Sequence, residues 1–118
     1  MLLVKTYLMS SNIHGIGLFS DQDIKKGEKI YQVDGFTLRF DENEYQHYLK
    51  LNKDFVLKYF WKSGNLYFCS LDNDRFMNHS DNPNTIKTED ATYAKIDIKK
   101  GEEITCNYND FCELGLNW

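Results

Sequence analysis

An octapeptide that occurs twice, with one residue changed, is the feature that most constrains the fold of this 118-residue chain. Residues 23–30 read DIKKGEKI and residues 97–104 read DIKKGEEI. In each copy an apolar residue precedes a Lys-Lys-Gly turn, and a second apolar residue re-enters the core three positions after the glycine. The flanks of the two copies share little, so we interpret them as two uses of one turn device. A duplicated unit is the alternative interpretation.

Short strand patterns separated by turns cover much of the remaining sequence. Apolar, aromatic and β-branched residues or strict alternation mark these patterns. They predict strands at residues 2–9, 66–71, 91–98 and 103–108. Residues 28–40 additionally favour a tight hairpin, with two strands around Asp34-Gly35. The polar segment 78–84 is predicted to have no regular structure.

Signals for helices are fewer. Asp41 and Glu44 have the spacing of a capping box and predict a helix that runs to about Leu51. The apolar segment 55–61 fits either a helix or a strand, and residues 72–77 predict one helical turn. The chain is therefore expected to be a single, mostly β domain with several short sheets and one or two short helices.

The charge of the chain is uneven. The net charge of −4 argues against non-specific binding to nucleic acid, because proteins that bind phosphates are usually basic. Residues 1–70 carry nine basic and eight acidic side chains, a net charge of +1. Residues 71–118 carry five and ten, a net charge of −5. The acidic half suits a basic partner such as a lysine-rich peptide, or it is simply a solvated surface.

Cysteine and apolar patterns bear on the compartment. We expect no membrane partner, because no apolar run is long enough to span a bilayer, and no signal peptide is apparent at the N-terminus. The three cysteines are odd in number and form no CxxC pair, and the three histidines are scattered. These patterns predict a reducing intracellular compartment and no metal site.

Three segments carry residues suited to chemistry: HGIGLF at 14–19, RFMNHSDNPN at 75–84 and GEEITCNY at 101–108. The glycines of the first allow a backbone to approach a ligand closely. The Asn and His side chains of the second both donate and accept hydrogen bonds. Taken singly, the segments fit a plain turn, an Asx-rich surface loop and a strand ending in a core tyrosine.

The order of the three segments resembles that of the SET-domain protein lysine methyltransferases. The resemblance spans roughly Lys5 to Asp110 and is greatest to the minimal, single-domain members of viruses and microbes. It implies a β-clip SET fold with a C-terminal pseudoknot. Residues 1–118 would then form one SET domain, with a motif core at about 5–110 and a C-terminal aromatic tail at 111–118.

The resemblance also implies roles for individual residues. Tyr108 would be the catalytic tyrosine beside the transferred methyl group. S-adenosyl-L-methionine (AdoMet) would be the methyl donor, with no metal required. Its binding would involve backbone of the first segment and residues of the second: Gly15, Ile16, Gly17, Leu18, Asn78 and His79. Asn78 would hold the amino group of the ligand, and His79 would contact the adenine, largely through its backbone.

A substrate channel is implied around Cys106, Tyr108, Phe111 and Trp118. Cys106 stands where many family members have a larger aromatic residue, which favours the addition of more than one methyl group. Only Cys112 follows Tyr108, so the zinc-binding segment of many nuclear members is not expected. The aromatic tail is expected to act as a lid over the channel or as a homodimer contact.

The function expected from this resemblance is transfer of a methyl group from AdoMet to a lysine side chain. A basic protein or peptide, such as a histone tail, is the expected substrate. The alternative is a catalytically inactive SET-fold module that binds peptide or AdoMet.

Overall fold

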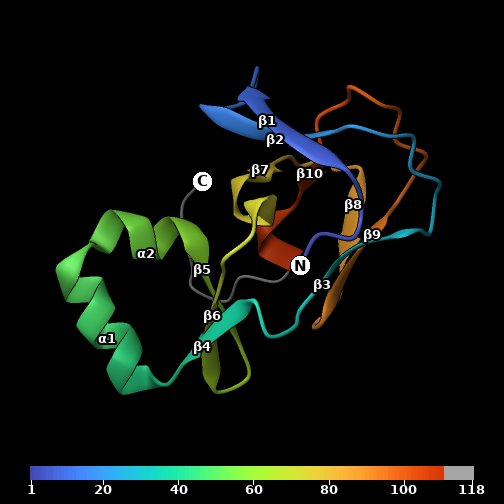
Figure 1. Ribbon diagram of the computed structural model, residues 1–118. Coiled ribbons are helices and arrows are strands. Elements are labelled where there is room, and N and C mark those ends of the chain that lie inside the picture. The colour runs from blue at the N-terminus through green and yellow to red at the C-terminus, as the bar shows by residue number, and fades with distance from the viewer. Residues whose placement is uncertain (111–118) are drawn as a thin grey trace.

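Four small sheets make up the part of the chain that the computed structural model describes, residues 1–110 (Figure 1). The strands are β1 (Thr6–Ser10), β2 (Ile16–Ser20), β3 (Lys29–Gln32), β4 (Thr37–Phe40), β5 (Phe60–Ser63), β6 (Leu66–Ser70), β7 (Asn78–His79), β8 (Thr85–Lys87), β9 (Ala91–Ala94) and β10 (Thr105–Cys106). The helices are α1 (Glu42–Leu51) and α2 (Lys53–Tyr59), with 3₁₀ turns η1 (Asn73–Phe76) and η2 (Tyr108–Asp110). The expectation of a mostly β domain with several short sheets and one or two short helices is confirmed, and the helices number two among residues 1–110.

The strands of residues 1–110 form antiparallel sheets around one short parallel pair. β1 and β2 form an antiparallel hairpin, and β3-β9-β8 and β4-β6-β5 form three-stranded antiparallel sheets. β7 and β10 form a short parallel pair. In Figure 1 this pair lies between the β1–β2 hairpin at the top of the view and the β4-β6-β5 sheet below. The threaded C-terminal pseudoknot stays a prediction.

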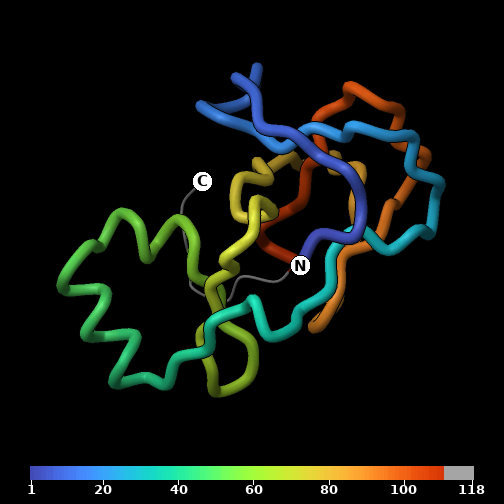
Figure 2. Tube along the Cα trace, in the orientation of Figure 1, coloured from blue at the N-terminus to red at the C-terminus, as the bar shows by residue number. Residues whose placement is uncertain are grey.

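The two copies of the octapeptide lie against each other. Ile24 N–H donates to the Ile98 carbonyl at 2.7 Å, and Ile98 N–H donates back to the Ile24 carbonyl at 2.8 Å. Gly27 and Gly101 both have positive φ, +87° and +93°, a conformation that favours glycine. Figure 2 shows the two segments side by side at the right of the molecule. Each copy is therefore a turn, as expected, and each is also the binding surface of the other.

Side chains repeat this exchange across the pair. The Asp23 carboxylate accepts a hydrogen bond from Lys100 N–H at 2.9 Å. In the reciprocal contact, the Asp97 carboxylate accepts one from Lys26 N–H at 2.8 Å. The paired copies place four isoleucines in the main core, each no more than 1% exposed: Ile24, Ile30, Ile98 and Ile104.

A second, aromatic core forms where the helices cover the β4-β6-β5 sheet. Tyr45 of α1 stacks on Tyr67 of β6 with 3.8 Å between ring centroids, and Val56 of α2 is 2% exposed beside them.

The capping box of α1 is confirmed, because Glu44 N–H donates to Asp41 at 2.8 Å and Asp41 N–H donates to Glu44 at 3.0 Å. No helix of residues 1–110 is long and apolar enough to cross a membrane.

The hairpin predicted around Asp34-Gly35 is wrong. The turn itself forms, since Thr37 N–H donates to the Asp34 carbonyl at 3.0 Å. Its flanking strands diverge, however, and β3 pairs with β9 while β4 pairs with β6. β9 and β6 are the central strands of two sheets, so this arrangement completes two three-stranded sheets where the hairpin would have made one isolated pair.

Other predicted element boundaries differ from those of the structure by a few residues. The ambiguous segment 55–61 is a helix up to Tyr59, where α2 ends, and a strand from Phe60, where β5 begins. The polar segment 78–84 contains one short strand, β7, because the backbone of Asn78 and His79 pairs with β10. The first predicted strand begins later, at Thr6, and the predicted strand at 91–98 ends at Ala94.

Candidate active site

The parallel β7–β10 pair brings the second and third segments together. Asn78 lies opposite Thr105 and His79 lies opposite Cys106. Ser80 N–H continues the contact by donating to the Cys106 carbonyl at 2.9 Å. Residues about thirty positions apart in the sequence therefore share one strand pair, which places Tyr108 beside the Asn-His segment.

The Asn78 side chain joins this pair to the first segment. It is 5% exposed, and its Nδ2 atom lies 3.0 Å from the His14 carbonyl, 3.3 Å from the Ile16 carbonyl and 3.0 Å from Glu103 Oε2. An amide NH₂ has two N–H bonds, so three acceptors face two donors. This acceptor-rich group, formed by Ser11, His14, Ile16, Asn78 and Glu103, is called the Asn78 cluster below.

Glu103 and Ser11 are members of this cluster that the sequence reasoning missed. Ser11 Oγ lies 2.8 and 2.9 Å from the two carboxylate oxygens of Glu103. A Cβ atom added at Gly17 would lie 2.5 Å from Glu103 Oε2 and 3.0 Å from Ser11 Cβ, so this glycine leaves room for the carboxylate. Residues 104–106 are all buried, so no alternation along this segment marks Glu103 apart from its neighbour Glu102 in the sequence.

Tyr108 is held at three points. Its Oη donates to the Met77 carbonyl at 2.8 Å. Its backbone N–H donates to His79 Nδ1 at 3.1 Å, and the two rings lie 5.3 Å apart between centroids. His79 Nε2 in turn lies 2.8 Å from Asp81 Oδ1. The phenol is therefore fixed in position by the same segment that carries Asn78.

The remaining predicted site residues lie in different surroundings. Ile16 is 54% exposed, whereas Leu18 is fully buried and its carbonyl accepts a hydrogen bond from Ile104 N–H at 2.8 Å. Gly15 has a φ of +47° with open space around its Cβ direction. Cys106 is 1% exposed in the main core, and burial raises the pKa of its thiol to about 11.

The predicted roles of Phe111 and Trp118 in the substrate channel fall outside the described residues, and the roles assigned to the other site residues stay predictions. Among residues 1–110, no group of three or more His, Cys, Asp or Glu side chains is placed to hold a metal ion.

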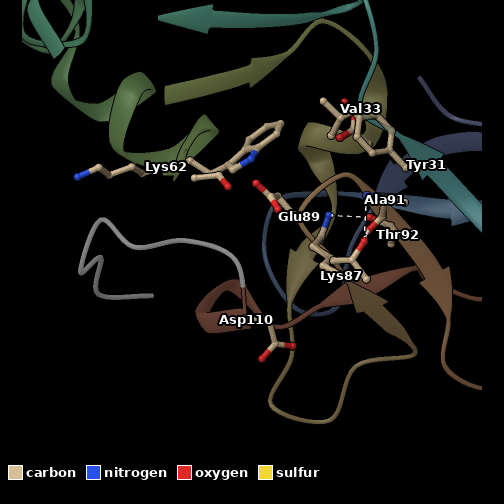
Figure 3. A pocket seen from close by; sticks show the side chains of 12 residues that line it. Tyr31, Val33, Lys62, Lys87, Glu89, Ala91, Thr92 and Asp110 are labelled. Carbon is tan, nitrogen blue, oxygen red and sulfur yellow. Dashed lines mark hydrogen bonds between the residues drawn. The ribbon is translucent and has the colours of Figure 1, made fainter. Parts of the chain in front are cut away.

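A second feature is a pocket of about 310 Å³ between β5 and the β8–β9 hairpin (Figure 3). Its lining includes Trp61, Asp74, Glu89 and Asp110, and Lys87, whose Nζ donates to Thr92 at 3.2 Å. Lys62 extends away from the other labelled side chains in Figure 3. Among residues 1–110, β5 is an edge strand of its sheet, and Trp61, Lys62 and Ser63 of this strand line the pocket. Asp110 connects the pocket to the turn that begins at Tyr108.

The buried carboxyl group of Asp74 lowers the stability of the folded protein at neutral pH. Asp74 is 7% exposed and accepts a hydrogen bond from Ser70 Oγ, and burial raises the pKa of its carboxyl from 3.8 to about 6. Because the folded state binds this proton more tightly, the free energy of unfolding falls as pH rises from about 4 to about 6. The loss is about 3 kcal/mol at most.

We therefore expect Asp74→Asn to stabilise the protein at pH 7 by about 1–3 kcal/mol, because the amide keeps an acceptor for Ser70 and carries no buried charge. Urea unfolding at pH 4.5 and pH 7 measures the effect. Asp54→Asn, at an exposed position of α2, is the matched control. A variant with the same stability and the same pH dependence as the parent would contradict this account of Asp74.

Comparison with known proteins agrees with this geometry. A family model described as "SET domain" matches residues 15–109. The H3 lysine-36 specific histone-lysine N-methyltransferase of Candida albicans is 30% identical over 132 aligned residues, which cover 89% of this chain and 14% of that protein. The chain thus spans a small part of that relative's length. The histone-lysine N-methyltransferase trr of Drosophila melanogaster is 28% identical, over 86% of this chain and 5% of that protein.

Solved structures share the fold. A histone methyltransferase candidate of Plasmodium falciparum is 27% identical, with a TM-score of 0.67 over 99% of this chain and 98% of that chain. The Polycomb repressive complex 2 of Chaetomium thermophilum, in a form bound to S-adenosylmethionine, gives a TM-score of 0.75 at 22% identity over 92% of this chain and 16% of that chain. Because the family match runs through all three segments that meet at the Asn78 cluster and Tyr108, this chain belongs to the SET domain family.

Proposed function

We propose that this chain is a protein-lysine N-methyltransferase that takes its methyl group from AdoMet and acts on a basic protein, a histone tail first among them. The observation that carries the proposal is the single Asn78 amide that reaches the His14 and Ile16 carbonyls and Glu103. It assembles the three segments of the family into one site beside Tyr108. The relatives named as histone-lysine methyltransferases support the activity.

The residues of the Asn78 cluster fit the donor. AdoMet carries an ammonium group and a sulfonium, both cationic, and the cluster offers two carbonyls and a carboxylate to a single amide donor. Within residues 1–110 no donor is bound to Asn78 Oδ1, which suits an ammonium hydrogen. Asn78 and the Gly15–Gly17 backbone would hold the amino-acid part, and His79 would lie beside the adenine. When bound, AdoMet supplies an electrophilic methyl group.

The chain's own residues would prepare the acceptor. A lysine with a pKa near 10.4 must lose its proton to attack, which costs about 4–5 kcal/mol at pH 7. A site that excludes water and faces a sulfonium disfavours the ammonium form and lowers this cost. Tyr108, fixed by the Met77 carbonyl and His79, would orient the amine toward the methyl group. Neither a metal nor an acid–base pair is needed for this reaction.

The pocket that Asp110 lines, together with Lys62 and Lys87, has more carboxylates than ammonium groups, which supports a basic substrate. Asp74, Glu89 and Asp110 supply carboxylates, and Trp61 supplies an aromatic wall for an aliphatic or cationic side chain. Within residues 1–110, β5 has no strand partner on its outer edge, and this edge could pair with an extended peptide backbone. Histone H3 is the first candidate, because the Candida albicans relative is named as H3 lysine-36 specific.

Two further properties are proposed. The chain forms a homodimer, which light scattering tests, and it adds more than one methyl group to its lysine, which mass spectrometry tests.

Incubation with labelled AdoMet and a histone mixture tests the proposed function. Transfer of label to a lysine, located by mass spectrometry, is the expected result. The alternative function, an inactive module that binds peptide or AdoMet, would give binding in calorimetry with no label transferred. The intact Asn78, His79 and Tyr108 favour the enzyme.

Asn78→Ala is expected to weaken AdoMet binding by about 1–3 kcal/mol, or roughly 5- to 150-fold in Kd, because the ammonium group of the ligand would lose the Asn78 amide as its partner. Calorimetry measures the Kd, and a thermal melt shows whether the fold survives. Asn43→Ala, at an exposed position of α1, controls for loss of an amide. An unchanged Kd in a folded Asn78→Ala protein would remove this residue from the donor site.

A further inference from the structure

The hydrogen bonds of the His79 ring define its tautomer. A backbone N–H can only donate, so the bond from Tyr108 N–H at 3.1 Å requires an unprotonated Nδ1. The single ring proton of the neutral imidazole then lies on Nε2. Nε2 is 2.8 Å from Asp81 Oδ1, and a carboxylate can only accept. Both contacts are satisfied together only by the Nε2–H tautomer.

The bond to Tyr108 holds the start of a turn. Tyr108 is the first residue of η2, and the first N–H groups of a helical turn have no partner within it. His79 Nδ1 supplies that partner, and its ring lies against the Tyr108 ring. A change in the tautomer of His79 would place a second N–H against Tyr108 N–H and release this end of the turn.

Asp81 is carried to the ring by a local turn, in which Asn82 N–H donates to Ser80 Oγ at 3.1 Å. We propose that Asp81 is a positioning residue for methyl transfer: it fixes the Nε2–H tautomer of His79, and His79 in turn holds the backbone and ring of Tyr108. This inference rests on the proposed function. The Asp81 side chain is 95% exposed, so water competes for the same ring proton and the effect is moderate.

Two variants separate this role from a general loss of charge. Asp81→Ala removes the acceptor, whereas Asp81→Asn keeps an oxygen that can accept from Nε2–H. We expect Asp81→Ala to lower kcat about 5- to 10-fold, while the KM for AdoMet changes by less than about twofold. The Asp81→Asn variant should keep most of the wild-type kcat. Asp54→Ala, at an exposed position of α2, is the charge control and should match the wild type.

The ¹⁵N shifts of the labelled His79 ring supply a readout that does not need activity. We expect the Nε2–H form in the wild type and in Asp81→Asn, and a mixture of tautomers in Asp81→Ala. An Nδ1–H ring in the wild type would overturn the proposal. So would a fall in kcat with an unchanged tautomer, or a changed tautomer with wild-type kcat. If the wild type transfers no methyl group to any lysine, the proposed function fails, and the ¹⁵N result still decides whether Asp81 fixes the ring.

Discussion

Tyr108→Phe is expected to lower kcat by at least about 100-fold while the Kd for AdoMet changes by less than about threefold. The phenol is fixed by its bond to the Met77 carbonyl, and we place it beside the reacting nitrogen. An interaction made mainly in the transition state appears in kcat rather than in ground-state affinity. Single-turnover kinetics with a lysine peptide, together with calorimetry for AdoMet, measure both quantities.

The fold of the Tyr108→Phe variant needs its own check, because the lost hydroxyl also leaves the Met77 carbonyl without that donor. A thermal melt reports this loss, which is about 1 kcal/mol for one hydrogen bond. Tyr48→Phe removes a hydroxyl from an exposed tyrosine of α1 and should keep wild-type turnover. A Tyr108→Phe protein that turns over at the wild-type rate would exclude Tyr108 from catalysis.

Gly17→Ala is expected to weaken AdoMet binding by at least about tenfold. The new methyl group would lie 2.5 Å from Glu103 Oε2. The carboxylate can swing aside, but in doing so it leaves Ser11 Oγ and Asn78 Nδ2. Loss of hydrogen bonds to a partly buried charge costs about 1.5–3 kcal/mol each, so the cluster that holds Asn78 in place would be disrupted.

Gly35→Ala is the matched control for this substitution, since nothing lies within 4 Å of a Cβ at that position. Its Kd for AdoMet should equal that of the wild type. A double-mutant cycle identifies the cause. In a Glu103→Ala background, Gly17→Ala should add little, because the carboxylate it displaces is already absent. Additive losses, or a Gly17→Ala protein with wild-type affinity, would show that the glycine is not there to admit Glu103.

Local features of the sequence predicted local structure well. The capping box of Asp41 and Glu44 depends on residues three apart and is present as expected. The order of the three segments predicted the family because each segment carries its residues in a short, specific pattern. The Asp34-Gly35 hairpin failed because the partners of β3 and β4 lie far along the chain, where a turn preference has no influence.

The site shows the same division. Asn78, His79 and Tyr108 stand in patterns that can be read directly, so they could be proposed from the sequence. Glu103 could not be ranked above Glu102, because only the direction of the backbone decides that one contacts Ser11 and the other bonds to Lys99 N–H in a turn. Contacts that join distant segments depend on geometry that the sequence pattern does not carry.

The paired octapeptides also set where the chain can change in length. Their reciprocal side-chain bonds join residues 71 and 77 positions apart, so the two copies enclose a loop that contains α1, α2 and the β4-β6-β5 sheet. Doubling the length of such a closed loop costs only about 0.6 kcal/mol in closure entropy. Residues inserted between α1 and α2 would therefore change the stability of the paired octapeptides little. The neighbouring strands that carry the Asn78 cluster would also be nearly as stable as before. The connection between α1 and α2 is therefore a place where added residues would lower the free energy of unfolding only slightly.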